Sequence, residues 1–309
     1  MYLQNKPRIT NLWSKVVGGE NEKWLTRVTV ESTGPYKFTL KEVSGGFSLE
    51  CSGVEINMPE GRLEVNDGLL RDISIERAGN DTARVELFLD HPAECAYVLY
   101  NDFPCRLVLN LNRDFIKGLL SGKRIVVDPG HGGKNLGGRG QVSLLEKDVV
   151  IPIANNLERN LKKAGAEVLL TRRTDKDVPL DGRAALATNA NADAFISIHT
   201  NASADRSDVG AATLYSPHDN GSRELAVYIQ KEIIKKLRVK DRGITIQQGL
   251  GCVSKEIPAV EVEVVTITNI VEEVFLRGLT IQERAAEGIT NGLIKYFACG
   301  GPGAKGDTK

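Results

Sequence analysis

Short runs that alternate apolar and polar residues fill the first third of the chain. These runs are 25–32, 36–43, 73–78, 83–90 and 105–112. Such alternation lets a strand bury one face and expose the other, and turn residues such as "STGP" and "AGND" separate the runs. No helical period occurs in this part, so the pattern predicts an all-β sandwich.

The pattern changes near residue 120, where apolar strands begin to alternate with helical periods. The predicted strands are 124–130, 166–172, 192–199, 211–216 and 257–265. The predicted helices are 147–164, 183–190, 222–238 and 281–298, the last with a capping box of Thr280 and Glu283. Alternation of this kind predicts an α/β domain with a mostly parallel twisted sheet flanked by helices.

Length and charge agree with two ordinary domains. The 309 residues predict a domain over 1–120, a second over 121–300 and a disordered tail over 301–309. Forty basic and forty acidic residues cancel, so nucleic acid and an anionic membrane are not expected partners. Five cysteines without CxxC spacing predict neither a disulfide framework nor a zinc–thiolate site.

Export is not evident from the sequence. The opening residues "MYLQNKPRIT" lack the basic and apolar regions of a secretory signal, and no apolar run is long enough for a transmembrane segment.

The segment "IVVDPGHGGKNLGG" places His131 in a glycine-rich loop directly after a predicted strand. Glycine-rich loops can bind phosphate, but a dinucleotide fingerprint starting at Gly130 has Asn135 where its third glycine belongs. A P-loop starting at Gly133 continues with Arg139 and Gly140 in place of Lys and Ser or Thr. Nucleotide binding is therefore disfavoured.

A metal site is the second interpretation of this loop. His199 ends another predicted strand, and Glu146 begins the first predicted helix of the α/β domain. Since ligands bind beyond the carboxyl ends of parallel strands, His131, His199 and Glu146 can converge there, and two histidines with one carboxylate suit catalytic zinc. Each residue alone also fits a structural role, because strand-end histidines often lie on the surface and carboxylates cap helices. Only the combination favours a metal.

The second half of the chain resembles a known family through several motifs in order. These are "IVVDPGHGG", "EKD", "GAEVLLTRRTD", "LDGRAALATNANADAFISIHTNAS", "DRGI" and "IPAVEVE". Together they resemble the zinc-dependent N-acetylmuramoyl-L-alanine amidases of the amidase type 3 family over about residues 123–298. Residues 1–120 resemble the AMIN domain, an all-β module that targets such enzymes to the cell wall, through their strand pattern and "CRLVLNLN".

The resemblance implies a role for particular residues. It makes His131, Glu146 and His199 the Zn²⁺ ligands and Glu263 the general base that deprotonates water for attack on the muramoyl amide. The chain departs from the family after this glutamate, because Val264 and Val265 begin the stretch where Gly-Phe is usual.

Several residues near these motifs have open or secondary roles. Glu261 lies two residues before Glu263 on the same strand face and could share or replace its role. Asp128 either orients His131 or stabilises the turn. The resemblance further implies substrate contacts from Arg183, Asn201 and Arg242, but each arginine equally fits a role that fixes a loop through a carboxylate pair. A loop position predicts a surface role for His218.

These inferences predict a monomeric peptidoglycan amidase of the cell envelope. A trimmed export signal, or action inside a sporulating mother cell, would reconcile that location with the opening residues. Two alternatives stay open: a zinc carboxypeptidase-like hydrolase of another amide, and a wall-binding regulator whose altered strand 261–266 no longer supports turnover.

Overall fold

The computed structural model describes residues 6–18, 22–218 and 221–300, and it divides the chain into two compact units. The division falls between Gly118 and Leu119, close to the predicted boundary after residue 120. A short helix, α1 (Asp114–Leu120), spans it. The predicted disordered tail, 301–309, lies outside the described residues.

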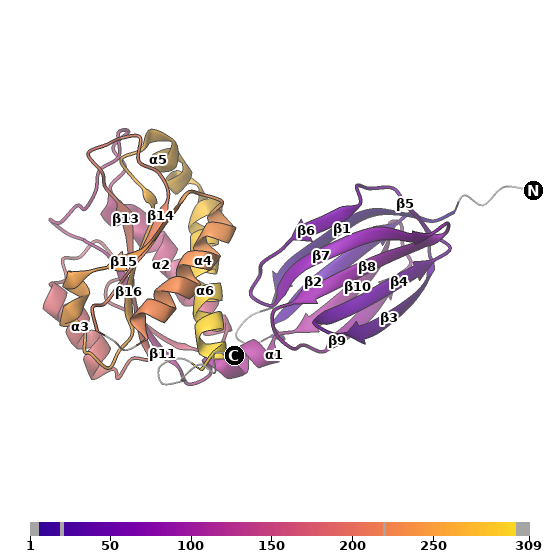
Figure 1. Cartoon of the computed structure of the whole chain (residues 1–309), viewed down its shortest axis with the longest axis horizontal. Helices are drawn as coiled ribbons and strands as arrows, with labels where there is room; N and C mark the ends of the chain where they lie inside the picture. Colours follow the sequence, from indigo (N-terminus) through magenta and orange to yellow (C-terminus); the bar gives the residue numbers. More distant parts are fainter. Residues whose placement is uncertain (1–5, 19–21, 219–220, 301–309) are drawn as a thin grey trace, which may run out of the picture. The chain divides into compact units, whose positions relative to one another are not determined.

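The first unit consists of two five-stranded sheets (Figure 1). One sheet has the order β5-β1-β2-β10-β9 and the other has β3-β4-β8-β7-β6. The strands are β1 (Arg8–Val17), β2 (Leu25–Ser32), β3 (Lys37–Val43), β4 (Gly46–Ser52), β5 (Glu55–Ile56), β6 (Gly61–Glu64), β7 (Leu70–Gly79), β8 (Thr82–Leu89), β9 (Cys95–Tyr100) and β10 (Cys105–Asn112).

Alternate residues of the central strands form the core of this unit. Leu107, Leu109 and Leu111 of β10 are buried, as are Val85 and Leu87 of β8. All five predicted runs are strands, so the all-β prediction is confirmed. The predicted runs did not include β1, β4, β5, β6 or β9. In β1 a register shift between Ile9 and Asn11 interrupts the period of two.

The second unit is built on a six-stranded sheet with the order β12-β11-β13-β16-β14-β15. Its elements are β11 (Arg124–Pro129), α2 (Glu146–Lys163), β12 (Glu167–Leu170), α3 (Leu180–Asn189), β13 (Ala194–Asn201), β14 (Ala211–Tyr215), α4 (Ser222–Leu237), β15 (Asp241–Ile246), the 3-10 helix η1 (Gln248–Cys252), β16 (Ala259–Thr266), α5 (Ile270–Arg277) and α6 (Leu279–Ala298). The α/β prediction is confirmed. The sheet is mixed, since β14 runs antiparallel to β16 while the other neighbouring strands pair in parallel.

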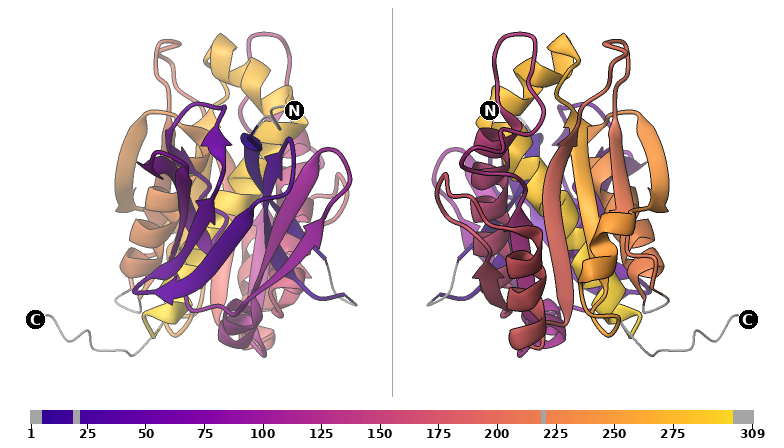
Figure 2. Two further views of the ribbon diagram at one scale, coloured as in Figure 1. Left: turned by 90° about the vertical axis from the view of Figure 1, so that its right-hand side faces the viewer. Right: turned by 90° about the vertical axis from the view of Figure 1, so that its left-hand side faces the viewer.

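Helices cover both faces of this sheet (Figure 2). On one face α2 packs on β11, β12 and β13, α4 packs on β14, β15 and β16, and α6 contacts both helices. On the other face α3 and η1 enclose an apolar cluster that includes Phe195, Ala187 and Leu250. No helix in the described part of the chain is both long and apolar enough to span a membrane.

The C-terminal helix α6 differs from the prediction at its start. It begins at Leu279 after Gly278, and no side chain caps its first turn, so the predicted capping box of Thr280 and Glu283 is wrong. Its contact with α4 depends on small residues. A Cβ atom added at Gly292 would lie 2.6 Å from the Cα atom of Ile229, so glycine permits the close approach of the two helices.

We expect Gly292→Ala to lower the free energy of unfolding of the second unit by up to about 2 kcal/mol. Overpacking costs about 1–3 kcal/mol, and the better helix propensity of alanine returns about 1 kcal/mol. Urea titration followed by circular dichroism measures the change. The control is Gly182→Ala in α3 of the same unit, where the nearest atom to an added Cβ would lie at 3.8 Å. Equal stability of the two variants would contradict the packing argument.

Candidate metal centre and active site

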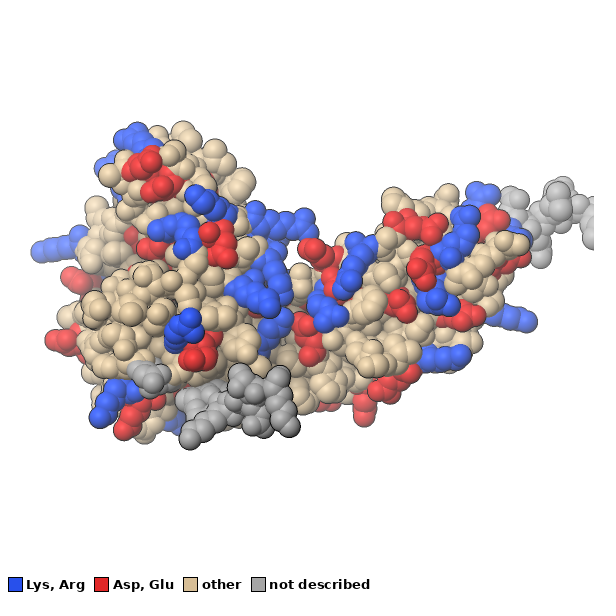
Figure 3. Space-filling view, in the orientation of Figure 1, with Lys and Arg blue, Asp and Glu red and all other residues tan. Residues whose placement is uncertain are grey.

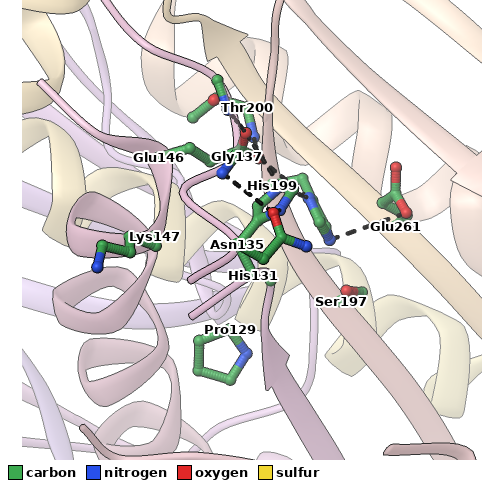
Figure 4. A network of polar contacts seen from close by, with 12 residues as sticks. Pro129, His131, Asn135, Gly137, Glu146, Lys147, Ser197, His199, Thr200 and Glu261 are labelled. Atoms are coloured by element: carbon green, nitrogen blue, oxygen red, sulfur yellow. Dashed lines mark hydrogen bonds and ion pairs between the residues drawn. The ribbon is translucent and has the colours of Figure 1, made fainter. Parts of the chain in front are cut away.

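Two neighbouring parallel strands bring the two histidines together. Strands β11 and β13 pair in parallel, with Pro129 opposite Ile198, so their carboxyl ends lie at one edge of the sheet. His131 follows β11, and His199 lies near the end of β13 (Figure 4). Glu146, the first residue of α2, completes the group. One donor atom from each of these three residues lies within 4.8 Å of the other two.

The three side chains face one another at short distances. His131 Nε2 is 3.1 Å from Glu146 Oε2 and 3.1 Å from His199 Nδ1. His199 Nδ1 is 3.0 Å from Glu146 Oε1. Two imidazole nitrogens and a carboxylate are the donors that catalytic zinc prefers. The chemistry of this donor set therefore fits a zinc ion.

The loop after β11 is shaped around these side chains. His131 has φ 59°, and its Nδ1 is 2.9 Å from Asn135 Oδ1, a contact that holds the ring and leaves Nε2 directed at Glu146. Gly137 has φ 68°, and a Cβ atom there would lie 2.5 Å from the His131 ring and 2.7 Å from Glu146 Oε2. The close approach of backbone to the donors therefore requires glycine at this position.

Glu146 is a buried carboxylate with hydrogen bonds to both oxygens. The Gly138 amide donates to Oε2 at 2.7 Å, and the Thr200 amide donates to Oε1 at 2.8 Å. Burial raises the pKa of this carboxyl group, but hydrogen bonds and charge interactions with the two histidines outweigh burial and hold the pKa well below its usual range. Glu146 is therefore an anion that faces the histidines.

The same contacts shift the pKa of His199 upward. Burial lowers the pKa of its imidazole, but the hydrogen bond with Glu146 and the nearby Glu261 carboxylate raise the pKa by more. The negative charge that surrounds His199 therefore favours positive charge among the three donors, which a divalent cation could also supply.

Asp128 lies behind the metal centre and does not orient the His131 ring. Its carboxylate accepts hydrogen bonds from Arg183 Nη1 at 2.6 Å, from Ser197 Oγ at 2.8 Å and from Thr171 Oγ1. Of the two predicted roles, the contacts favour stabilisation of the turn. The ring of His131 is held by Asn135, a residue that the sequence analysis considered only as a missing glycine.

Arg183 supports the same loop from the first turns of α3. Its guanidinium is buried and donates to the carbonyl groups of Pro129 and His131 at 2.9 and 2.7 Å. Arg172, which follows β12, donates to the carbonyl groups of Pro129 and Gly130 in the same way. Sequence reasoning missed Arg172, although "TRRTD" after a strand was a visible signal. These contacts favour a positioning role for both arginines.

Strand β16 presents two glutamates beside His199. Glu261 Oε2 is 3.9 Å from His199 Nε2, and Gln247 Nε2 donates to Glu261 Oε1 at 3.2 Å. Glu263 lies opposite His199 in the register and forms an ion pair of 2.7 Å with Arg242 Nη1. Burial raises the pKa of Glu263, the Arg242 charge and hydrogen bond lower it, and the net shift is upward. Glu261 is thus nearer to the donors, and Glu263 is the one that pairs with an arginine.

Two further predicted residues lie apart from the three donors. Asn201 Nδ2 donates to Thr266 Oγ1 at 3.1 Å, where β13 and β16 end. His218 Nε2 is 3.3 Å from the Gly251 carbonyl oxygen, and its side chain is half-buried. Neither side chain belongs to the three-donor cluster.

A cavity of about 330 Å³ opens beside the donors. His131, His199 and Glu261 line it on the polar side, while Leu180 and Leu250 belong to its apolar lining. An apolar cavity with a few converging polar groups is the usual form of a small-ligand site. This site can bind a metal ion, bind part of a substrate and move a proton through a glutamate.

Comparison with known proteins agrees with this geometry. The chain is 33% identical over 184 residues to the N-acetylmuramoyl-L-alanine amidase LytC of Bacillus subtilis, covering 59% of this chain and 37% of LytC. It is 34% identical over 184 residues to the probable cell wall amidase LytH of Staphylococcus aureus, covering 59% of this chain and 61% of LytH. The chain thus spans less than two thirds of either relative.

A solved structure matches the second unit. The N-acetylmuramoyl-L-alanine amidase from Clostridium difficile 630 superposes with a TM-score of 0.56 and 33% identity, over 58% of this chain and 98% of that one. The model of one protein family matches residues 125–295, which include all three donors and both glutamates of β16. This chain therefore belongs to the Amidase_3 family, the N-acetylmuramoyl-L-alanine amidases.

Proposed function

We propose that this protein hydrolyses the amide bond between N-acetylmuramic acid and L-alanine in peptidoglycan, using a zinc ion. The observation that carries the proposal is the convergence of His131, Glu146 and His199 beside a cavity. Glu261 lines this cavity, and Glu263 lies two residues further along the same strand, β16. Family membership supports the same reaction class. His131 Nε2, His199 Nδ1 and a Glu146 oxygen would hold the zinc ion, which when bound supplies Lewis acidity toward water and a carbonyl group.

Glu263 is the general base in this proposal. Its carboxylate would accept a proton from the attacking water and return it to the nitrogen of the leaving amine. The raised pKa of Glu263 supports this role, because a carboxylic acid with a higher pKa is a stronger base in its ionised form. Glu261, closer to His199, is the alternative base, and the two variants must be compared directly.

The other residues position the substrate or the loop. Asn201 and Arg242 are proposed substrate contacts, and Arg242 also holds Glu263 by its ion pair. For Arg183 the buried contacts support positioning of the His131 loop over the substrate contact that the resemblance implied.

The cell envelope is the proposed location, and peptidoglycan is the proposed partner. The name of LytH, a probable cell wall amidase, supports this location. The all-β first unit would act as an AMIN-like module that holds the enzyme at the wall, and its two-sheet architecture supports that assignment.

We expect His199→Ala to lose bound zinc, because it removes one of three donors from the metal centre. Zinc content per chain, measured by inductively coupled plasma mass spectrometry after dialysis, tests this directly. His218→Ala is the matched control, since it removes a histidine of the same unit outside the donor cluster, and it should keep the metal of the wild type. Full zinc retention in His199→Ala would refute the ligand set.

We expect Glu263→Gln to lower kcat on muropeptides by about 10²–10⁴, the usual contribution of a general base, with zinc content unchanged. Mass spectrometry of the products should show free stem peptide and sugar with the wild type. Glu261→Gln is the comparison variant, and it should keep more activity than Glu263→Gln.

The same assay separates the alternatives. A larger loss in Glu261→Gln would transfer the base role to Glu261. Release of carboxyl-terminal amino acids would indicate a carboxypeptidase-like enzyme. Wild-type protein that binds zinc and sacculi without product would indicate a wall-binding regulator.

We expect Arg242→Gln to move the acid limb of kcat/KM to higher pH. The base acts when deprotonated, so activity is lost as the pH falls through the pKa of Glu263. The Arg242 charge and hydrogen bond both lower this pKa, and their removal therefore raises it further. The pH profile measures the shift against Arg206→Gln, an arginine that contacts Gln141 instead. An unchanged or lowered limb would argue against Glu263 as the base.

A further inference from the structure

Strand β9 differs from every other sheet edge in the described residues. The two sheets of the first unit and the sheet of the second unit end in six edge strands, which are β3, β5, β6, β9, β12 and β15. Five of them contain Lys, Arg, Asp or Glu, whereas β9 reads CAYVLY and contains none. Charged residues are the common means by which proteins prevent an edge strand from pairing with another chain. β9 lacks this protection.

The apolar side chains of β9 are also poorly covered. Leu99 and Tyr97 pair with Leu107 and Leu109 of β10, so they lie on the core-facing side of the sheet. Leu107 and Leu109 are 1% and 0% exposed, but Leu99 and Tyr97 are 41% and 56% exposed. Tyr97 keeps an edge-to-face contact with Phe38 of β3, at 5.1 Å between ring centroids. The core-facing side chains of this sheet therefore continue into β9, where the opposite sheet no longer covers them fully.

The opposite face of β9 adds to this surface. Val98 and Tyr100 point away from the core, and both are largely exposed. β9 ends its sheet, and among the described residues β10 is its one strand partner (Figure 1). Within that part of the chain, β9 thus combines an unpaired backbone edge with exposed apolar side chains on both faces.

We propose that β9 is an interface at which two copies of this chain pair edge to edge. Two β9 strands would pair without bringing any charge of their own into the interface, and β9 is the one uncharged edge strand among the described residues. In antiparallel pairing about a twofold axis, the free backbone groups and the exposed apolar side chains of β9 are covered on both copies at once. This assignment differs from the monomer predicted from the sequence.

Charge distinguishes the two registers that are centred on β9, with the axis at Tyr97 or at Val98. In an antiparallel pair, residues that lie opposite each other are on the same face of the sheet. The twofold axis must therefore pass beside one residue of β9, which then lies opposite the same residue of the second copy. An axis at Val98 would set Glu94 opposite Asp102, which like charges disfavour. An axis at Tyr97 sets Tyr97 opposite Tyr97, and Leu99 opposite Cys95 of the second copy. The register with its axis at Tyr97 brings the exposed Tyr97 and Leu99 side chains of the two copies to one face, and it brings no charges of like sign together.

The first test is the mass in solution. Sedimentation of the full chain from about 1 to about 100 μM, which brackets a micromolar Kd, should show a dimer of the wild type. Leu99→Lys should weaken the dimer by roughly 100-fold, because it brings a charge into the interface twice. Leu63→Lys on β6 is the matched control, an exposed leucine on an edge strand that is already charged, and it should leave the dimer intact.

The second test fixes the register. Leu99→Cys should form a disulfide-linked dimer with Cys95 of the second copy under a mild oxidant, since opposed Cα atoms lie within disulfide range. Adding Cys95→Ser should abolish the link, and both variants are read on a non-reducing gel. A wild type that is monomeric throughout this range, or a dimer that Leu99→Lys leaves unchanged, would overturn the proposal. Absence of the cross-link in a confirmed dimer would overturn the register centred on Tyr97.

Discussion

The buried carboxylate of Glu146 is the group on which the active site depends. An anion in the protein interior is costly unless hydrogen bonds and opposite charge compensate it. Here two backbone amides and two imidazoles converge on its oxygens. The positions of the loop after β11, the end of β13 and the start of α2 are therefore coupled through one side chain. A metal ion at this point would strengthen the same coupling by adding positive charge among the donors.

Much of the architecture could be predicted because it follows from side-chain periodicity. Both fold classes, the principal strands of the parallel region and the long helices are set by which positions must be buried. The family was recognisable for a related reason, since motifs such as "DPGHGG" and "SIHTN" record strand ends whose residues serve chemistry. The convergence of His131 and His199 followed from strand direction, and that of Glu146 from its position at the start of the first helix of the α/β domain.

The missed features are those in which local pattern and tertiary environment conflict. Helix α5 buries Glu272 and Glu273 and exposes Val271 and Val274, the reverse of a normal amphipathic helix. Its glutamates accept hydrogen bonds from loop amides, including Val142 and Leu144 to Glu273 and Gly210 to Glu272. No periodicity rule anticipates a helix whose core side is acidic. The sequence could not predict which of Glu261 and Glu263 lies nearer to His199, because both are on the same strand face and differ only in their tertiary neighbours.

The glycines of the loop after β11 have a consequence for reading similar sequences. At Gly137 the missing side chain leaves space that the His131 ring and the Glu146 carboxylate fill, and Gly130 lies equally close to His199. The space left by these glycines thus follows the shape of the His131, Glu146 and His199 side chains and is not a cradle for an anion. Two loops can share a glycine-rich composition although the glycines of one leave space for a phosphate and those of the other leave space for imidazole rings. What distinguishes them is which side chains elsewhere in the fold occupy the space that each glycine leaves.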